Sequence, residues 1–187
     1  MATFQKLHPP LRAFIERQRL FFVATAAPDG RVNLSPKGLT TLRVLGPRRI
    51  VWLNLSGSGN ETAAHLRESA RMTLMFCAFE GQAMILRVYG QASVLHPRDP
   101  GWDALADLFP PLAGSRQIFD VAIDLVQNSC GTGVPLMPYQ GERAEAELLP
   151  FYEEMGEAGV RDYWQRKNQV SIDGKPTGIL PEAPQPK

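Results

Sequence analysis

Short apolar runs, each about the length of a β-strand, follow one another along the first two thirds of the chain. Runs of this length that end at turn-forming residues are typical of strands, whether they alternate or are continuously apolar. The pattern predicts strands over residues 20–26, 31–35, 40–45, 49–55, 71–79, 82–95 and 119–125.

The clearest period-two alternation lies in the last of these runs. Apolar Phe119, Val121, Ile123 and Leu125 alternate with polar or small residues, which indicates a strand with one buried face. Glycine inside a strand often marks a bulge, and proline is confined to edges and bulges. Gly90 therefore predicts a bend, and Pro36 predicts an edge strand or bulge.

Tight turns at Pro28-Asp29-Gly30 and Gly46-Pro47 connect the early strands, so these strands should be antiparallel. We predict a mainly β (α+β) fold, an antiparallel split β-barrel of six to seven strands with peripheral helices. Helices are expected near residues 9–19, 61–69, 102–109 and 141–168, the last divided at Pro150 and at Gly156/Gly159.

The length of 187 residues suits one domain, residues 1–187. Residues 136–187 are expected to form a helical and extended C-terminal extension that packs on the barrel or on a partner chain. The tail from residue 171 has no periodicity, so it should be ordered only where it packs.

Composition and charge disfavour several classes of function. The net charge of +1 and the lack of a basic stripe disfavour nucleic-acid binding. No apolar window is long enough for a membrane span, and no secretory signal opens the chain, which predicts a cytoplasmic protein. The two cysteines, Cys77 and Cys130, form no C-x-x-C pair and the histidines are scattered, so no metal site is predicted.

Candidate chemistry concentrates between residues 33 and 62. A strand enters the small-residue loop 56–60, which opens into a predicted helix, an arrangement that offers backbone N–H groups to an anion. Asn60 would cap the helix, and Lys37 could add a positive charge, so we predict a phosphate-binding site. An ordinary loop and cap remain the alternative, because neither of the common phosphate-loop motifs is present.

The order of these pieces resembles the FMN-binding split-barrel family related to pyridoxamine 5'-phosphate oxidase. The resemblance is carried by the early helix near residues 9–19, the strand and turn of residues 20–30, the run 33–38, the loop and helix start 56–66, and two later segments, 128–136 and 171–174. These later segments are similar to one uncharacterised branch of the family.

The resemblance implies a homodimer with FMN as the cofactor in clefts between the subunits. It also implies cofactor-binding residues, with no catalytic residue identified. They are Ser35, Pro36, Lys37 and Gly38 along the flavin, Trp52 and Leu53 on a second strand, and Ser58, Asn60 and Thr62 in the phosphate turn.

The function expected from this resemblance is an FMN-dependent oxidoreductase that acts on an unidentified small molecule by hydride transfer. The oxidase itself ends in a segment bearing arginine and histidine, whereas residues 176–187 contain neither, which disfavours pyridoxamine 5'-phosphate as the substrate. The alternative is a flavin- or haem-binding protein without turnover.

Several of these residues could have an ordinary structural or solvent-exposed role instead of a functional one. Lys37 could donate to the flavin N1–C2 edge or be a solvated lysine. Trp52 is expected to be a core or interface aromatic rather than a flavin-stacking group. His65 is expected at the surface, and Cys130 is expected to be structural.

Overall fold

The computed structural model describes residues 1–181, and one antiparallel sheet of eight strands dominates them. The mainly β prediction is confirmed, with eight strands rather than six or seven. The strands are β1 (Ala2–Phe4), β2 (Phe21–Thr25), β3 (Asn33–Lys37), β4 (Leu42–Gly46), β5 (Arg49–Leu55), β6 (Arg71–Cys77), β7 (Ile85–Leu95) and β8 (Ser115–Ser129).

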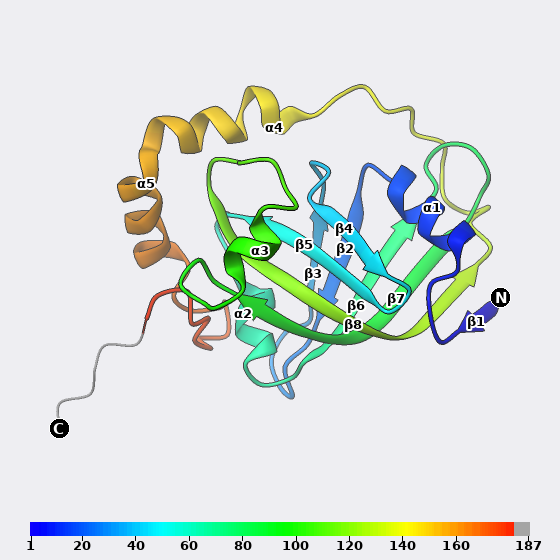
Figure 1. Cartoon of the computed structure of the whole chain (residues 1–187), viewed down its shortest axis with the longest axis horizontal. Coiled ribbons are helices and arrows are strands. Elements are labelled where there is room, and N and C mark those ends of the chain that lie inside the picture. The colour runs from blue at the N-terminus through cyan, green and yellow to red at the C-terminus, as the bar shows by residue number, and fades with distance from the viewer. Residues whose placement is uncertain (182–187) are drawn as a thin grey trace.

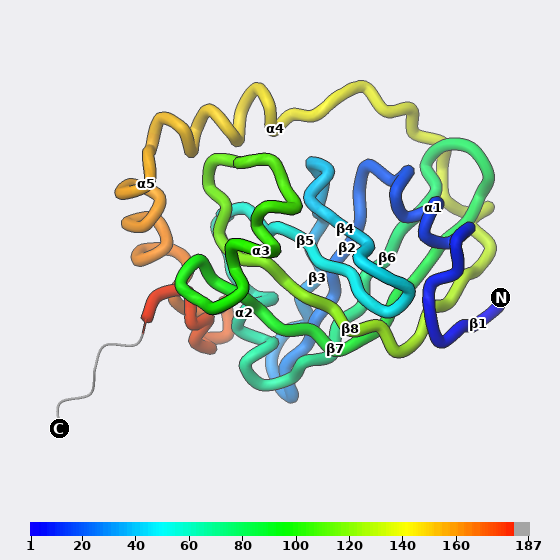
Figure 2. The backbone as a smooth tube through the Cα atoms, in the orientation of Figure 1, coloured from blue at the N-terminus to red at the C-terminus, as the bar shows by residue number. Residues whose placement is uncertain are grey.

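The sheet runs in the order β3-β2-β6-β7-β8-β5-β4, and β1 pairs with β8. The pairs β2–β3 and β4–β5 are antiparallel hairpin neighbours, as the turns predict. However, β3 and β4 do not pair although only residues 38–41 separate them; they form the two ends of the strand order. The backbone turns there through Leu39 and Thr40, which have positive φ values of 64° and 48°. The sheet therefore curls until its ends approach each other, as the tube in Figure 2 shows.

Buried apolar side chains from most strands fill the interior of this curled sheet. Trp52 is fully buried and stacks on Phe119, with ring centroids 4.6 Å apart. Met72, Leu74 and Phe76 of β6 are also buried. Because the Trp52 side chain belongs to this core, its expected packing role is confirmed.

A bulge in β8 breaks the predicted alternation. Gly90 of β7 pairs with Ile123 while Tyr89 pairs with Leu125, so β8 gains one residue at this point. Phe119, Val121 and Ile123 are buried, but the inward position then passes to Val126 and Leu125 is 37% exposed. The predicted common face of Leu125 with Ile123 is therefore wrong, and Gly90 marks a bulge as expected.

The helices are peripheral and shorter than predicted in most cases. The predicted helix 61–69 ends at Leu66, and Pro150 lies in the first turn of the last helix instead of breaking it. Gly156, with φ 65°, does interrupt that helix. The helices are α1 (Pro9–Arg17), α2 (Glu61–Leu66), α3 (Trp102–Ala106), α4 (Arg143–Ala146) and α5 (Leu148–Lys167).

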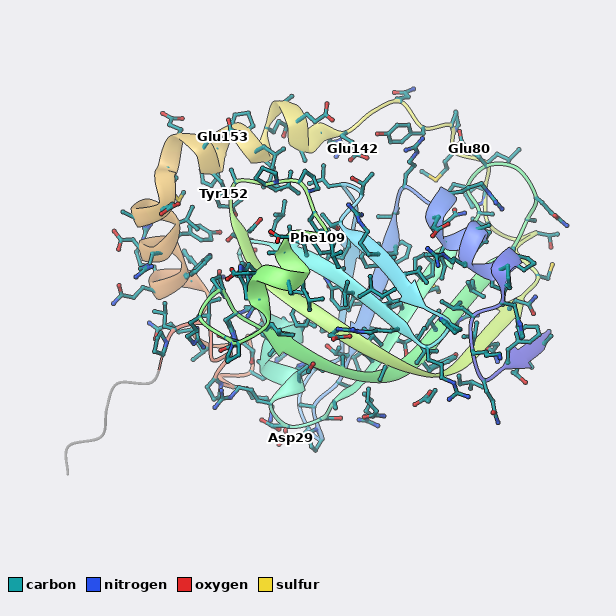
Figure 3. The ribbon with its side chains drawn as sticks, viewed as in Figure 1. Asp29, Glu80, Phe109, Glu142, Tyr152 and Glu153 are labelled. Atoms are coloured by element: carbon teal, nitrogen blue, oxygen red, sulfur yellow. The ribbon has the colours of Figure 1, made fainter. Side chains whose placement is uncertain are left out.

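After β8 the chain crosses one end of the barrel and descends along its side as α4 and α5 (Figure 1). Tyr152 of α5 lies on the barrel side of the helix and Glu153 lies on the outer side (Figure 3). The ring of Tyr152 packs against Gly114, where an added Cβ would approach it to 2.5 Å. Residues 168–181 then contact the barrel itself, while the end of the predicted tail, residues 182–187, falls outside the described part.

Candidate functional site

A cavity of about 180 Å³ lies between β3 and β5 at the connection that joins the ends of the sheet. It brings together four of the nine predicted site residues: Pro36, Lys37, Gly38 and Leu53. The remaining lining residues are Leu39, Thr41, Asn54, Leu55, Ser56 and Leu148, the last contributed by α5.

Two larger hollows adjoin this cavity. One, of about 670 Å³, shares Leu53 with it and extends along α3 to Phe109. The other, of about 430 Å³, shares Gly38 and Thr41 and extends toward α1. Of the residues that the resemblance placed along a flavin, Leu53 therefore borders the first of these hollows and Gly38 borders the second.

Lys37 supplies a positive charge to the small cavity. Its side chain is half-buried, and loss of solvation, with a smaller effect of the nearby Arg116 charge, lowers the pKa of its amine to about 8. Within residues 1–181 it has no carboxylate partner. A partly desolvated amine without a counter-ion is costly, which favours a binding role for Lys37 over a freely solvated lysine.

Arg116, at the start of β8, is a second buried cation, with 3% of its surface exposed. Its Nη1 donates to the carbonyl oxygen of Gly59 at 3.0 Å and to Oδ1 of Asn168 at 2.8 Å. Its Nε has no partner. Burial lowers the pKa of Arg116 to about 10, so it stays positively charged at neutral pH.

The loop 56–60 is arranged differently from the predicted phosphate turn. Asn60 makes no side-chain cap bond to α2; it is 2% exposed and both its amide nitrogen and its amide oxygen lack partners. Asn60 does occupy the predicted N-cap position of α2, but the expected side-chain capping bond is absent. Ser58 is exposed to solvent. The helix has only six residues, so the Asn60 side chain, rather than the helix terminus, is the notable polar group here.

Thr62 belongs to a separate polar network on the side of β2 and β3. Its hydroxyl accepts a hydrogen bond from Asn33, which also donates to Thr25. The Thr25 hydroxyl is 3.0 Å from Nδ1 of His65. His65 is 1% exposed, so its predicted surface position is wrong, because α2 turns this side chain against β2.

The other predicted residues are less directly placed at the cavity. Ser35 pairs with Val23 in the β2–β3 hairpin and is half-buried, and it does not line the cavity. The Trp52 side chain faces the barrel interior with no exposed surface, whereas the adjacent Leu53 faces the cavity.

The C-terminal extension contributes polar groups that sequence reasoning missed. Asn168 is fully buried and, besides accepting from Arg116, donates Nδ2 to the carbonyl oxygen of Gly57 at 2.8 Å. Trp164 Nε1 donates to the Ser56 hydroxyl at 2.7 Å. Asn168 carried no sequence signal. An arginine at an inward-packed position of a strand is a usable signal, but the predicted strand began at Phe119 and excluded Arg116.

The metal-ligating side chains and the two cysteines form no second candidate site in the described residues. The described residues contain no cluster of three or more metal-ligating side chains and no helix long and apolar enough to cross a bilayer. Cys77 is buried, and the exposed Cys130 contacts the Thr132 hydroxyl at 3.0 Å.

Comparison with known proteins adds sequence and fold relationships. Residues 7–130 match the family model described as pyridoxamine 5'-phosphate oxidase. The pyridoxamine 5'-phosphate oxidase family protein ustO of Aspergillus flavus is 34% identical over 189 residues, covering 92% of this chain and 76% of that protein.

Two solved structures share the fold. HupZ of Group A Streptococcus superposes with a TM-score of 0.53 at 16% identity, over 65% of this chain and 93% of that one. A putative pyridoxamine 5'-phosphate oxidase of Lactobacillus delbrueckii gives a TM-score of 0.53 at 18% identity, over 66% and 95%. At these identities the likeness concerns the fold alone.

Proposed function

Because this chain belongs to the pyridoxamine 5'-phosphate oxidase family, we propose that it is a homodimeric FMN-binding oxidoreductase acting on a small molecule. The observation that carries the proposal is Lys37, a half-buried cation at the cavity between β3 and β5 with no carboxylate partner within residues 1–181. Such a charge favours an anionic ligand.

The residues present fit the phosphate end of FMN. A phosphate carries about two negative charges near neutral pH, and Lys37 and Arg116 are two cations close enough for Arg116 to lower the pKa of Lys37. The unpartnered amide of Asn60 supplies a further donor and acceptor. In this arrangement Pro36, Lys37 and Gly38, which line the cavity, would lie along the flavin, and Ser35 would precede them on β3 without lining it.

A second chain would complete the cleft. The cavity of about 180 Å³ is smaller than the roughly 300–1,000 Å³ typical of ligand pockets. β3, which forms one wall, is an end strand of the sheet; its Leu34 is 64% exposed, and Val32, just before the strand, is 74% exposed. Apolar side chains on an edge strand next to an incomplete pocket support a dimer in which this edge is covered.

Membership of the family suggests which part of the reaction the cofactor would perform and which part the protein would perform. When bound, FMN would supply the hydride chemistry, and the chain would supply orientation and electrostatics. Lys37 would hold positive charge at the cavity, and the apolar wall at Leu53 would exclude water from it.

The haem alternative receives less support from the side chains. Haem iron is commonly held by a histidine. His65 is buried against Thr25, and His96 is 5% exposed and held by Asp99 and Gln117. Only His8 is exposed among the three histidines.

The test is the flavin content and sedimentation mass of the purified protein. We expect visible flavin absorbance that NAD(P)H bleaches, one FMN per chain, and the mass of a dimer. Lys37→Met should lower the retained flavin, whereas Lys6→Met, which removes an exposed lysine elsewhere, should not. A protein that neither retains nor binds added FMN, or a haem Soret band without flavin, would contradict the proposal.

A further inference from the structure

We propose that the C-terminal extension completes the phosphate end of this site: Asn168 is a positioning residue that holds Arg116 without neutralising it, and Arg116 with Asn60 selects ligands that carry a terminal phosphate. This inference rests on the proposed flavin function and specifies which side chains read the phosphate.

The first support is the charge balance around Arg116. A buried arginine is normally paired with a carboxylate. Here the partners of its Nη1 are neutral oxygens, from the Gly59 backbone and the Asn168 side chain. No ion pair to Arg116 occurs within residues 1–181, so its positive charge is retained for another group.

The second support is the set of unpartnered atoms beside it. Arg116 Nε and both polar atoms of the Asn60 side chain are buried and make no hydrogen bond. Arg116 bonds to the carbonyl oxygen of Gly59, the residue before Asn60, so both residues adjoin the loop 56–60, although neither lines the cavity of about 180 Å³. Leaving a buried polar group unbonded costs about 1–3 kcal/mol, and an oxyanion that accepts from Nε and the Asn60 amide would remove that cost.

The third support is the number of hydrogen bonds that hold Asn168 in position. Its side chain bridges Arg116 and the carbonyl oxygen of Gly57, and its backbone oxygen accepts from the buried Thr177 hydroxyl. Trp164, one helical turn earlier, donates to Ser56 of the same loop. The extension thus fixes both the loop and the guanidinium at once.

Comparing FMN with riboflavin tests the proposal, because the two ligands differ only in the phosphate. Both affinities are measured by fluorescence quenching on the full chain after removal of bound flavin. In the wild type, FMN should bind much more tightly than riboflavin. Arg116→Gln should weaken FMN binding about 10- to 100-fold, the range of a charge-assisted hydrogen bond, and leave riboflavin within about twofold. Arg49→Gln, which removes an exposed arginine of β5 paired with Asp120, is the matched control.

Asn168→Asp separates a positioning role from a purely structural one. The substitution keeps an oxygen beside Arg116 but adds a carboxylate that would pair with it. It also removes the Nδ2 donor to the Gly57 carbonyl oxygen, a change that acts on both flavins alike. If Arg116 is only structural, FMN and riboflavin should therefore weaken together and the preference for FMN should stay unchanged. If Arg116 reads the phosphate, the FMN preference over riboflavin should fall in the variant while riboflavin binding persists; thermal melting, run in parallel, shows whether it remains folded.

Failure of this inference is distinguishable from failure of the flavin function. If the wild type binds FMN and Arg116→Gln keeps the full preference over riboflavin, or loses both ligands equally while folded, the phosphate role of Arg116 is refuted and the flavin function stands. If the wild type binds neither flavin, inorganic phosphate is the probe. Stabilisation of the wild type but not of Arg116→Gln would then support the anion site alone, and no stabilisation would refute it.

Discussion

Lys37 has a pKa far below that of an ordinary lysine because its amine is desolvated beside a second cation, not because of any reaction partner. The same desolvation makes the residue sensitive to pH near neutrality. A ligand phosphate beside the amine would favour the protonated form and raise its pKa again. Flavin binding and protonation of Lys37 should therefore be coupled.

We predict that the affinity for FMN changes little between about pH 7 and pH 8 and falls above pH 8, by up to about tenfold per pH unit, because binding then requires uptake of a proton by Lys37. Below about pH 6 the phosphate itself takes up a proton, which also weakens binding. Lys37→Arg should remove the dependence above pH 8, up to about pH 9, since its guanidinium stays charged and Arg116, with its pKa of about 10, is still protonated there. Fluorescence titrations from about pH 7 to about pH 9 measure it. An equally steep decline in Lys37→Met would contradict the assignment to Lys37.

The flavin-free protein should show the opposite trend. The unfolded lysine, with its pKa of 10.5, binds a proton more tightly than the folded one, with its pKa of about 8. Between these values the unfolded state holds more protons, so this group makes stability rise with pH. Urea unfolding at pH 8 and pH 10 should show a smaller increase in Lys37→Met than in the wild type.

Among the elements, the bulge of β7 and β8 depends on one glycine. A Cβ on Gly90 would lie 2.2 Å from the carbonyl oxygen of Ala122, a backbone atom of the paired strand. Gly90→Ala should therefore lower the free energy of unfolding by about 1–3 kcal/mol, as overpacking typically does. Gly46→Ala, with no atom within 4 Å of the added Cβ, is the control. Equal unfolding midpoints in urea would contradict this account of the bulge.

The elements that the sequence predicts well are those whose partners are near in the chain or whose pattern is strongly periodic. The β2–β3 and β4–β5 hairpins, β6 and the buried half of β8 follow from turn residues and alternation. β1 has three residues and no period to detect. The separation of β3 from β4 depends on the left-handed backbone at Leu39 and Thr40, residue types that seldom signal it.

The residues of the candidate site also differ in how far apart their partners lie in the sequence. Lys37, Gly38 and Leu53 were predictable because one local stretch, from β3 to β5, places them at one cavity. Arg116 and Asn168 meet across 52 positions, and Asn168 reaches Gly57 across 111. No local pattern links such residues, so the part of the site built by the C-terminal extension becomes visible only in the folded chain.

At the scale of the whole molecule, the C-terminal extension fastens to the barrel by two kinds of contact. Surface ion pairs, each with at least one partly or fully exposed partner, join Asp173 to Arg31, and Lys175 to Asp29 and Glu68, around the turn that Figure 3 labels at Asp29. Buried neutral hydrogen bonds join Asn168 to the loop 56–60 and to Arg116. Exposed ion pairs contribute little to stability, whereas a buried group that loses its partner is costly.

The two kinds of contact should therefore respond differently to substitution. Asn168→Ala leaves the Gly57 carbonyl oxygen without its donor and deprives Arg116 of an acceptor, so we expect a loss of about 1–3 kcal/mol in the free energy of unfolding. Lys175→Met should lower the melting temperature much less. Its effect should become smaller still at high salt, which screens the ion pairs, whereas the effect of Asn168→Ala should not depend on salt. Calorimetric melting of both variants at low and high ionic strength measures the difference. A larger loss for Lys175→Met, or a salt-sensitive loss for Asn168→Ala, would mean that surface charge rather than the buried amide holds the extension on the barrel.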